Sequence, residues 1–268
     1  MKRPVALTIA GSDSCGGAGI QADLKTFSAL GVYGATAVTS VTVQNTLGVR
    51  AAVTLPPEIV VGQIDAVLDD LPVAAAKTGM LATADVMRAV ADVLAARPIP
   101  WLVVDPVMIA TSGSRLMDEE ATDVLTGAVL PLAAVVTPNI EEAAVLAGFA
   151  VDDLESMAAA ARAIVDLGAS AALVKGGHLS GEATDILFDG AAMHSFSSER
   201  IEGGRLHGTG CTLSAAIAAG LAAGRPLETA VRDAKSFVTR AIRGAELAGG
   251  ASALLDHIGA GETGEEER

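Results

Sequence analysis

The chain has 268 residues, 51% of them hydrophobic and 3% aromatic, and its formal net charge is −14. This length and apolar content are ordinary for one α/β domain with a substantial core, so we expect a single domain over residues 1–258. The acidity argues against nucleic acid or an anionic membrane surface as a partner, because such a chain repels polyanions at long range.

The cysteine content and the apolar segments bear on location. Cys15 and Cys211 are too few for a disulfide framework, which favours a reducing compartment, and we expect a cytoplasmic protein. The apolar segment 5–10 is too short for a signal peptide. The uncharged segment 26–49 contains polar residues that a bilayer penalises, so we expect it to be buried in protein rather than in a membrane. The Gly- and Glu-rich tail 259–268 is expected to be disordered.

Short β-rich apolar runs alternate along the chain with longer alanine- and leucine-rich runs of helical spacing. The predicted strands are 5–10, 35–43, 74–77, 102–105, 134–137, 171–175 and 186–188. The predicted helices are 19–29, 57–70, 83–96, 119–130, 140–147, 154–167, 211–223 and 227–247. This alternation is typical of a mostly parallel sheet with helices on both faces. Ligands of such sheets bind beyond the carboxyl ends of the strands, where most polar clusters of this sequence fall.

A glycine-rich turn, Gly208-Thr209-Gly210-Cys211-Thr212, precedes a predicted helix of small residues. Glycines ahead of a helix let backbone N–H groups converge on an anion, and the helix dipole adds its positive end. The alternative is an ordinary turn in which Thr209 or Thr212 caps the helix. We expect Cys211 to have a lowered thiol pKa at this helix start, unless it is simply a small buried residue.

Three acidic or amide side chains follow predicted strands. Asp105, with Asn139 and Glu142, suits a hydrated Mg²⁺, which prefers few carboxylates and retains water. Asn139 and Glu142 also have the spacing of a capping box, and the residues alone leave both readings open. Lys175 follows another strand and can meet phosphate as a compact charge, or it can be an ordinary solvated lysine.

The segments after the first two strands suggest a small-molecule pocket. Gln44 offers both a donor and an acceptor, which complements an aminopyrimidine edge, and Asp23 can accept from a hydroxyl or amine. Met80 and Val107, at neighbouring strand ends, would supply apolar walls, although ordinary packing explains each of these residues too.

Two nucleotide-binding motifs are disfavoured. The stretch from Gly17 to Ala22 formally matches a dinucleotide fingerprint, but the next predicted strand runs to Gln44 without the acid that would hold a ribose. The loop after the first strand also lacks the Lys-Ser/Thr pair of a P-loop.

Taken together, the motifs resemble those of the bacterial hydroxymethylpyrimidine/phosphomethylpyrimidine kinases of thiamine biosynthesis, in the ribokinase superfamily. The motifs are the run from Thr8 to Lys25 (TIAGSDSCGGAGIQADLK), Val41 to Asn45 (VTVQN), Asp105-Pro106-Val107, Thr137-Pro138-Asn139 with Glu142, Lys175 to His178 (KGGH) and His207 to Thr212 (HGTGCT). The resemblance extends from about residue 4 to residue 250.

The resemblance implies a three-layer α/β/α fold and two successive ATP-dependent phosphorylations of 4-amino-5-hydroxymethyl-2-methylpyrimidine, first to the monophosphate and then to the diphosphate. Many ribokinase relatives have an aspartate as general base where this chain has Cys211, as the pyrimidine kinases do. The resemblance also implies that the protein forms a homodimer.

The resemblance also assigns residues to roles. The catalytic turn is Gly208, Thr209, Gly210 and Cys211; the pyrimidine contacts are Gly11, Ala18, Asp23, Thr42, Gln44, Met80 and Val107; the ATP contacts are Lys175 and Asn139; and the Mg²⁺ ligands are Asp105 and Glu142.

Three other functions are considered. A pyridoxal or pyridoxamine kinase of the same superfamily would accept a ring with a similar hydroxymethyl arm. A catalytically idle pyrimidine sensor on the same fold is disfavoured by Asp105, Glu142 and the glycine-rich turn, which would then have no use. An NAD-dependent oxidoreductase is disfavoured because the acid for the ribose is lacking.

Overall fold

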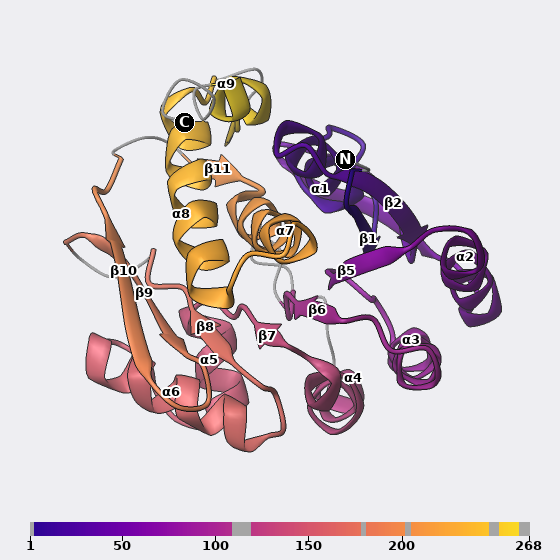
Figure 1. Cartoon of the computed structure of the whole chain (residues 1–268), viewed down its shortest axis with the longest axis horizontal. Helices are drawn as coiled ribbons and strands as arrows, with labels where there is room; N and C mark the ends of the chain where they lie inside the picture. Colours follow the sequence, from indigo (N-terminus) through magenta and orange to yellow (C-terminus); the bar gives the residue numbers. More distant parts are fainter. Residues whose placement is uncertain (1–2, 109–118, 178–180, 202–204, 247–251, 263–268) are drawn as a thin grey trace.

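The computed structural model describes residues 3–108, 119–177, 181–201, 205–246 and 252–262. A central 8-stranded sheet has the order β10-β9-β8-β7-β6-β5-β1-β2, and helices cover both of its faces (Figure 1). Its strands are β1 Val5–Ala10, β2 Tyr33–Val38, β5 Val73–Thr78, β6 Trp101–Val104, β7 Val135–Val136, β8 Ala172–Val174, β9 Ala183–Phe188 and β10 Met193–Ser198. All neighbours from β2 to β8 are parallel, whereas β9, near one edge, pairs antiparallel with both β8 and the edge strand β10.

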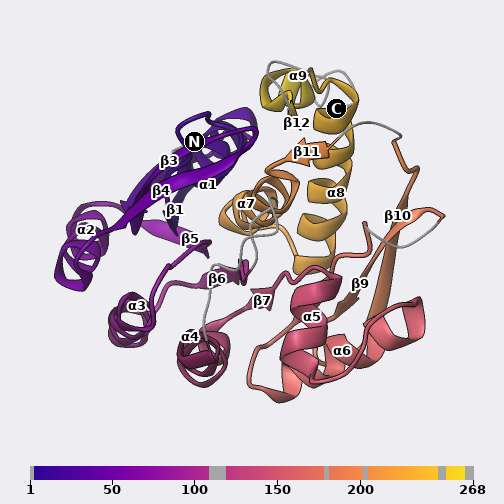
Figure 2. The ribbon, with the colours of Figure 1, turned by 180° about the vertical axis from the view of Figure 1, so that it is seen from behind.

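The helices form the two outer layers, which Figure 2 shows from behind. One layer contains α2 Pro57–Asp70, α3 Ala84–Ala96, α4 Glu119–Val124, α5 Ile140–Ala147 and α6 Leu154–Asp166. The other contains α1 Gly19–Ala29, α7 Thr209–Ala222, α8 Leu227–Arg243 and α9 His257–Glu262. This arrangement is the predicted three-layer α/β/α fold with a mostly parallel sheet.

Helix α7 is the central element of its layer. Every residue from Thr212 to Leu221 is buried, and the helix packs against β5, β6, α1 and α8. The alanines and glycine of this run explain why the helix can lie so close to its neighbours, since their side chains add little bulk. Its amino terminus therefore has a fixed position at the carboxyl edge of the sheet.

The predicted strand 35–43 is wrong as a single element, because the chain leaves the central sheet at Thr39. Residues Ser40–Asn45 form β3, which pairs with β4, Gly48–Thr54, in a separate two-stranded sheet. Thr42 is buried there, whereas Val41 and Val43 are 51% and 55% exposed. The expectation that the whole uncharged segment is buried therefore fails on one face of this hairpin.

Several element ends also differ from the prediction. The helix expected over 119–130 is α4 followed by a π-helical segment, Leu125–Val129, and a 3₁₀ turn, Leu130–Leu132. The short strands β11 Arg205–His207 and β12 Ser252–Leu254 pair with each other and were not predicted. Residues 259–262 of the tail expected to be disordered belong to α9, and 263–268 lie outside the described residues. Within the described ranges, no helix has the length and apolarity needed to cross a membrane.

Candidate active site

The glycine-rich turn forms the start of α7, and Gly208 is its N-cap in a left-handed conformation with φ of 85°. A Cβ at this position would lie 1.8 Å from the carbonyl oxygen of Gly17, so only glycine allows the turn to approach the loop after β1. Thr212 donates both its backbone N–H and its hydroxyl to the Gly208 oxygen, each at 2.9 Å. Within the described chain no side chain caps this helix start, so the alternative that Thr209 or Thr212 caps the helix is wrong.

A lysine and an aspartate lie directly beside this turn. Lys175 Nζ donates to Asp105 Oδ1 over 3.1 Å, and a Cβ added to Gly210 would lie only 3.2 Å from the same nitrogen. Burial opposes both charges, but the two groups stabilise each other, so the pKa of Asp105 is lowered and the pKa of Lys175 is raised. A fixed positive charge therefore adjoins the amino terminus of α7.

The neighbours of Asp105 hold its carboxylate in one orientation. Thr137 donates its hydroxyl to Oδ1 over 3.3 Å, and Ser214, one turn into α7, donates to Oδ2 over 3.2 Å. The backbone N–H of Asp105 donates to Thr78 on the adjacent strand. The Asp105 carboxylate therefore links the chain segments that directly follow β6, β7 and β8 to α7.

Asn139 and Glu142 form the capping box of α5. The Asn139 side chain accepts from the Glu142 N–H at 2.9 Å, and Glu142 Oε2 accepts from the Asn139 N–H at 2.8 Å. Glu142 Oε1 also accepts from the N–H of Met108. Burial raises the pKa of Glu142, with Lys175 opposing and Asp105 adding to the shift. The capping interpretation is thus correct for both residues, and Glu142 still lies in the electrostatic range of Asp105 and Lys175.

Asp23 is fully buried and bonded to side chains inside the protein. Its carboxylate accepts from Lys77 Nζ at 3.0 and 3.1 Å and from the Thr8 hydroxyl at 2.6 Å. Burial alone would lower the pKa of Lys77, but the Asp23 carboxylate and nearby acids outweigh it and the pKa is raised. The structure therefore gives Asp23 a structural partner inside the protein, Lys77, which sequence reasoning did not pair with it.

Cys211 lies in the first turn of α7, near this ion pair and beside Gly19, whose N–H contacts the sulfur. The expected lowering of its thiol pKa is wrong. Burial raises that pKa, Asp23 and Asp105 add to the shift, and the positive charge of Lys77 and the Gly19 N–H only oppose it. Cys211 is therefore a neutral thiol near pH 7 in the free protein.

The remaining predicted pocket residues lie around the loop after β1. Gly11 is close to Met80, because a Cβ added there would be 2.5 Å from the methionine methyl group. Thr42 donates its hydroxyl to the Ser12 oxygen, and the Ala18 N–H donates to Asp13. Val107 lies two residues after Asp105 and is half-buried.

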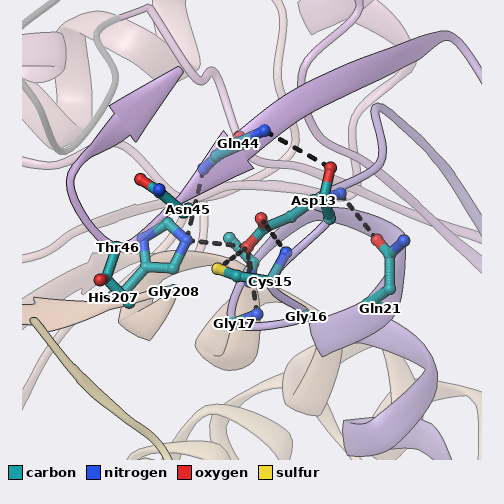
Figure 3. Close-up of polar contacts among 12 residues, drawn as sticks. Asp13, Cys15, Gly16, Gly17, Gln21, Gln44, Asn45, Thr46, His207 and Gly208 are labelled. Carbon is teal, nitrogen blue, oxygen red and sulfur yellow. Dashed lines mark hydrogen bonds and ion pairs between the residues drawn. The ribbon is translucent and has the colours of Figure 1, made fainter. Parts of the chain in front are cut away.

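Two residues that were not selected from the sequence organise this loop. Asp13 accepts from the N–H groups of Cys15, Gly17 and Ala18, and His207 Nε2 lies 2.8 Å from its Oδ2 (Figure 3). The amide nitrogen of Gln44 is 3.3 Å from that same His207 nitrogen. The sequence feature that could have identified Asp13 is its position as a charged residue in a glycine-rich loop after a buried strand.

Comparisons with known proteins agree with this geometry. The family model described as phosphomethylpyrimidine kinase matches residues 13–254. The hydroxymethylpyrimidine/phosphomethylpyrimidine kinase of Rhizobium meliloti is 55% identical over 244 residues, covering 90% of this chain and 91% of the relative. The thiamine biosynthesis bifunctional protein ThiED of Geobacter sulfurreducens is 51% identical over 257 residues, covering 96% of this chain; the chain spans about half of that relative, 52%.

Solved structures are similar over nearly the whole chain. The pyridoxal kinase of Staphylococcus aureus in complex with AMP-PCP and pyridoxal has a TM-score of 0.89 at 35% identity, covering 97% of this chain and 95% of that one. The phosphomethylpyrimidine kinase of Clostridium difficile has a TM-score of 0.81 at 43% identity, covering 90% and 100%. The fold is thus the ribokinase-like fold of small-molecule kinases. Within that class, the chain belongs to the phosphomethylpyrimidine kinase family.

Proposed function

We propose that the protein phosphorylates 4-amino-5-hydroxymethyl-2-methylpyrimidine with ATP, first to the monophosphate and then to the diphosphate, in the cytoplasm and in thiamine biosynthesis. The observation that carries the proposal is the close approach of Lys175 and Asp105 to Gly210 at the uncapped start of α7. The family match over residues 13–254 supplies the substrate. Mass spectrometry of a reaction with ATP, Mg²⁺ and this pyrimidine tests it, with mono- and diphosphate as the expected products.

The transferring phosphoryl group needs positive groups that are already in position. We assign this role to the N–H groups of residues Gly208 to Cys211 and to the Lys175 ammonium, which burial beside Asp105 keeps in one location. Asn139 is next to Lys175, since a backbone bridge joins the two residues, and we assign both to ATP.

Mg²⁺ fits the residues at this edge of the sheet. Asp105 and Glu142 are both buried carboxylates. Asp105 Oδ2 and the two Glu142 oxygens each accept one donor among the described residues and retain a lone pair toward a water of the ion's hydration shell, whereas Asp105 Oδ1 already accepts from Thr137 and Lys175. When bound, the ion would offset charge on the ATP phosphates. The chain's own contribution is to hold the two carboxylates: Asp105 through Lys175, Thr137 and Ser214, and Glu142 through the α5 cap.

Cys211 is assigned to position the pyrimidine hydroxyl, because a thiol with a raised pKa is a poor general base. The second step uses a phosphate that is already ionised and needs neither a base nor this contact. Cys211→Ala should therefore slow the first phosphorylation roughly 10²-fold and the second by less than about threefold, measured as separate kcat values with each substrate. Equal losses in both steps would remove this role.

Gln44 is assigned to the pyrimidine ring. It lies where the register between β3 and β4 shifts by one residue of β4, and its side chain contacts Thr42 and His207. Gln44→Ala removes a donor and an acceptor from the ring edge, so the KM for pyrimidine should rise about tenfold or more while the KM for ATP stays within about twofold. A selective rise in the KM for ATP would assign Gln44 to the nucleotide instead.

Activity toward pyridoxal is a second candidate, since several structurally similar proteins are pyridoxal kinases. Competition between pyridoxal and the pyrimidine at equal concentration, with both products quantified, discriminates the two. We expect the pyrimidine product to dominate; a dominant pyridoxal product would reverse the assignment.

We propose a homodimer formed through the β3–β4 hairpin. Val41 and Val53 are opposite each other in the hairpin register and, with Val43, are more than half exposed, which is unusual for so many neighbouring valines. Val43→Glu should shift the sedimentation coefficient from dimer to monomer, and Glu58→Gln on α2 serves as an exposed-site control. A wild-type protein that sediments as a monomer at micromolar concentration would contradict the dimer.

A further inference from the structure

Three side chains that can ligate a metal converge from two parts of the chain beside Gln44 (Figure 3). Asp13 and Cys15 come from the loop between β1 and α1, and His207 is the last residue of β11. The three ligand atoms, Asp13 Oδ2, Cys15 Sγ and His207 Nε2, all lie within 4.8 Å of one another. None of the three is used by the phosphoryl-transfer chemistry proposed above.

The loop holds Asp13 rigidly before any ligand arrives. In addition to the side chains of Cys15 and His207, three backbone N–H groups donate to the Asp13 carboxylate. They are those of Cys15 at 3.0 Å, Gly17 at 3.1 Å and Ala18 at 2.8 Å. Burial opposes ionisation, but the hydrogen bonds from His207, Cys15 and these amides outweigh it and lower the pKa of Asp13 to about 2. The carboxylate is therefore charged and preoriented at neutral pH.

Cys15 and His207 both donate a hydrogen bond to the same carboxylate oxygen of Asp13. Cys15 Sγ donates to Oδ2 over 3.3 Å, and because an ionised carboxylate can only accept, the 2.8 Å contact requires the proton of His207 on Nε2. A metal ion at this point would replace those two protons and bind sulfur, nitrogen and the Asp13 carboxylate. Oδ2 also accepts the N–H groups of Gly17 and Ala18, and Oδ1, which accepts the Cys15 N–H, retains a further lone pair. Gly17 makes the approach possible, since a Cβ there would lie 2.6 Å from the imidazole ring of His207.

We propose that Asp13, Cys15 and His207 form a binding site for a thiophilic divalent metal ion, with Zn²⁺ as the best match. A thiolate, an imidazole and a carboxylate are ordinary zinc ligands, whereas Mg²⁺ takes oxygen ligands. Bond lengths of about 2.0 Å to oxygen and nitrogen and 2.3 Å to sulfur, in tetrahedral geometry, require ligand separations of about 3.3 to 3.5 Å. The separations of Asp13 Oδ2 from His207 Nε2, 2.8 Å, and from Cys15 Sγ, 3.3 Å, approach these values within about half an ångström, and the third pair lies within 4.8 Å.

The site is coupled to Gln44, whose amide nitrogen lies 3.3 Å from the His207 nitrogen that would bind the metal. The proton on Nε2 already excludes a hydrogen bond from the Gln44 N–H in the free protein. A metal in its place would bring a divalent charge to that nitrogen, so the Gln44 amide must turn its oxygen toward the ion or move away. Because Gln44 is the proposed ring contact, this part of the inference rests on the proposed function and predicts that Zn²⁺ competes with the pyrimidine. Metal binding itself does not depend on that function.

Absorption spectroscopy with Co²⁺ as a probe tests the site on the whole chain. One equivalent should give a thiolate-to-cobalt band in the near ultraviolet, and Zn²⁺ should displace it with a 1:1 stoichiometry in calorimetry. The band should vanish in Cys15→Ser, which keeps a hydroxyl donor for Asp13, and persist in Cys211→Ser, which removes the other cysteine of the chain. A band that persists without Cys15, or the absence of 1:1 binding at about 10 µM metal, overturns the proposal.

A second variant guards against a folding defect at position 15. His207→Gln removes a direct ligand and should weaken Zn²⁺ binding by more than the roughly tenfold that loss of an outer-shell partner costs, while circular dichroism matches the wild type. In kinase assays with excess Mg²⁺, Zn²⁺ should raise the KM for pyrimidine in the wild type and not in Cys15→Ser. Zinc binding without any change in this KM would reject the coupling to Gln44 and leave both the site and the kinase assignment intact.

Discussion

Replacing Lys77 with methionine should lower the free energy of unfolding by about 3–5 kcal/mol, because it leaves the Asp23 carboxylate buried without its counter-charge. Both side chains are fully buried, and the Thr8 hydroxyl is the remaining donor that the structure gives Asp23. For a chain of this length the midpoint of thermal unfolding should fall by roughly 10 °C. Differential scanning calorimetry measures the shift.

The matched control is the double variant Asp23→Asn with Lys77→Met, which removes the orphaned charge as well as the ammonium. It should recover more than half of the lost stability, since replacing both ions of a buried pair costs far less than breaking it. If the single and double variants unfold at the same temperature, the loss comes from packing and the buried pair is not ionised.

Lys175→Met should lower kcat for both phosphorylations about 10²- to 10³-fold, the range seen when one preorganised charge-stabilising group is removed. The Lys175 ammonium adjoins the amino terminus of α7, where negative charge of the transferring phosphoryl group would be stabilised. The KM for pyrimidine should change little, because the role proposed for the lysine is at the ATP phosphates. Steady-state kinetics with each substrate measures both parameters.

Arg88→Met is the control for the removal of a basic side chain. Arg88 is on α3, in the opposite helix layer, and pairs with Asp85 and Glu120 at the surface. It should leave kcat within about twofold, as expected for an exposed ion pair. A Lys175→Met enzyme with kcat within about threefold of the wild type would exclude the lysine from charge stabilisation.

Much of the fold follows from hydrophobic periodicity. The bounds of β1, α1, α2 and α5 agree with the predicted segments, because strong apolar patterns there meet clear breaks such as Pro57 and Gly148. The pattern fails where burial is one-sided. The run through Thr39 looks continuous, yet the chain changes sheets there, and β10 is too rich in serine to stand out as a strand.

The candidate site was predictable as a set of strand ends but not as a set of contacts. Strand order brings Asp105, Asn139 and Lys175 to one edge, and the sequence predicted that grouping. The sequence could not reveal that Asp23 turns inward to Lys77, since that depends on which face of α1 meets the sheet. Likewise, the helix-start rule predicted a reactive Cys211, whereas burial beside Asp23 and Asp105 raises its pKa.

The most direct measurement is the product distribution over time when the purified protein is given ATP, Mg²⁺ and 4-amino-5-hydroxymethyl-2-methylpyrimidine, followed by mass spectrometry. We expect the monophosphate to accumulate first and then convert to the diphosphate, with one ADP formed at each step. The Lys175→Met variant should form both products far more slowly than the wild-type protein. A wild-type protein that forms neither phosphate while consuming another substrate, such as pyridoxal, would contradict the assignment.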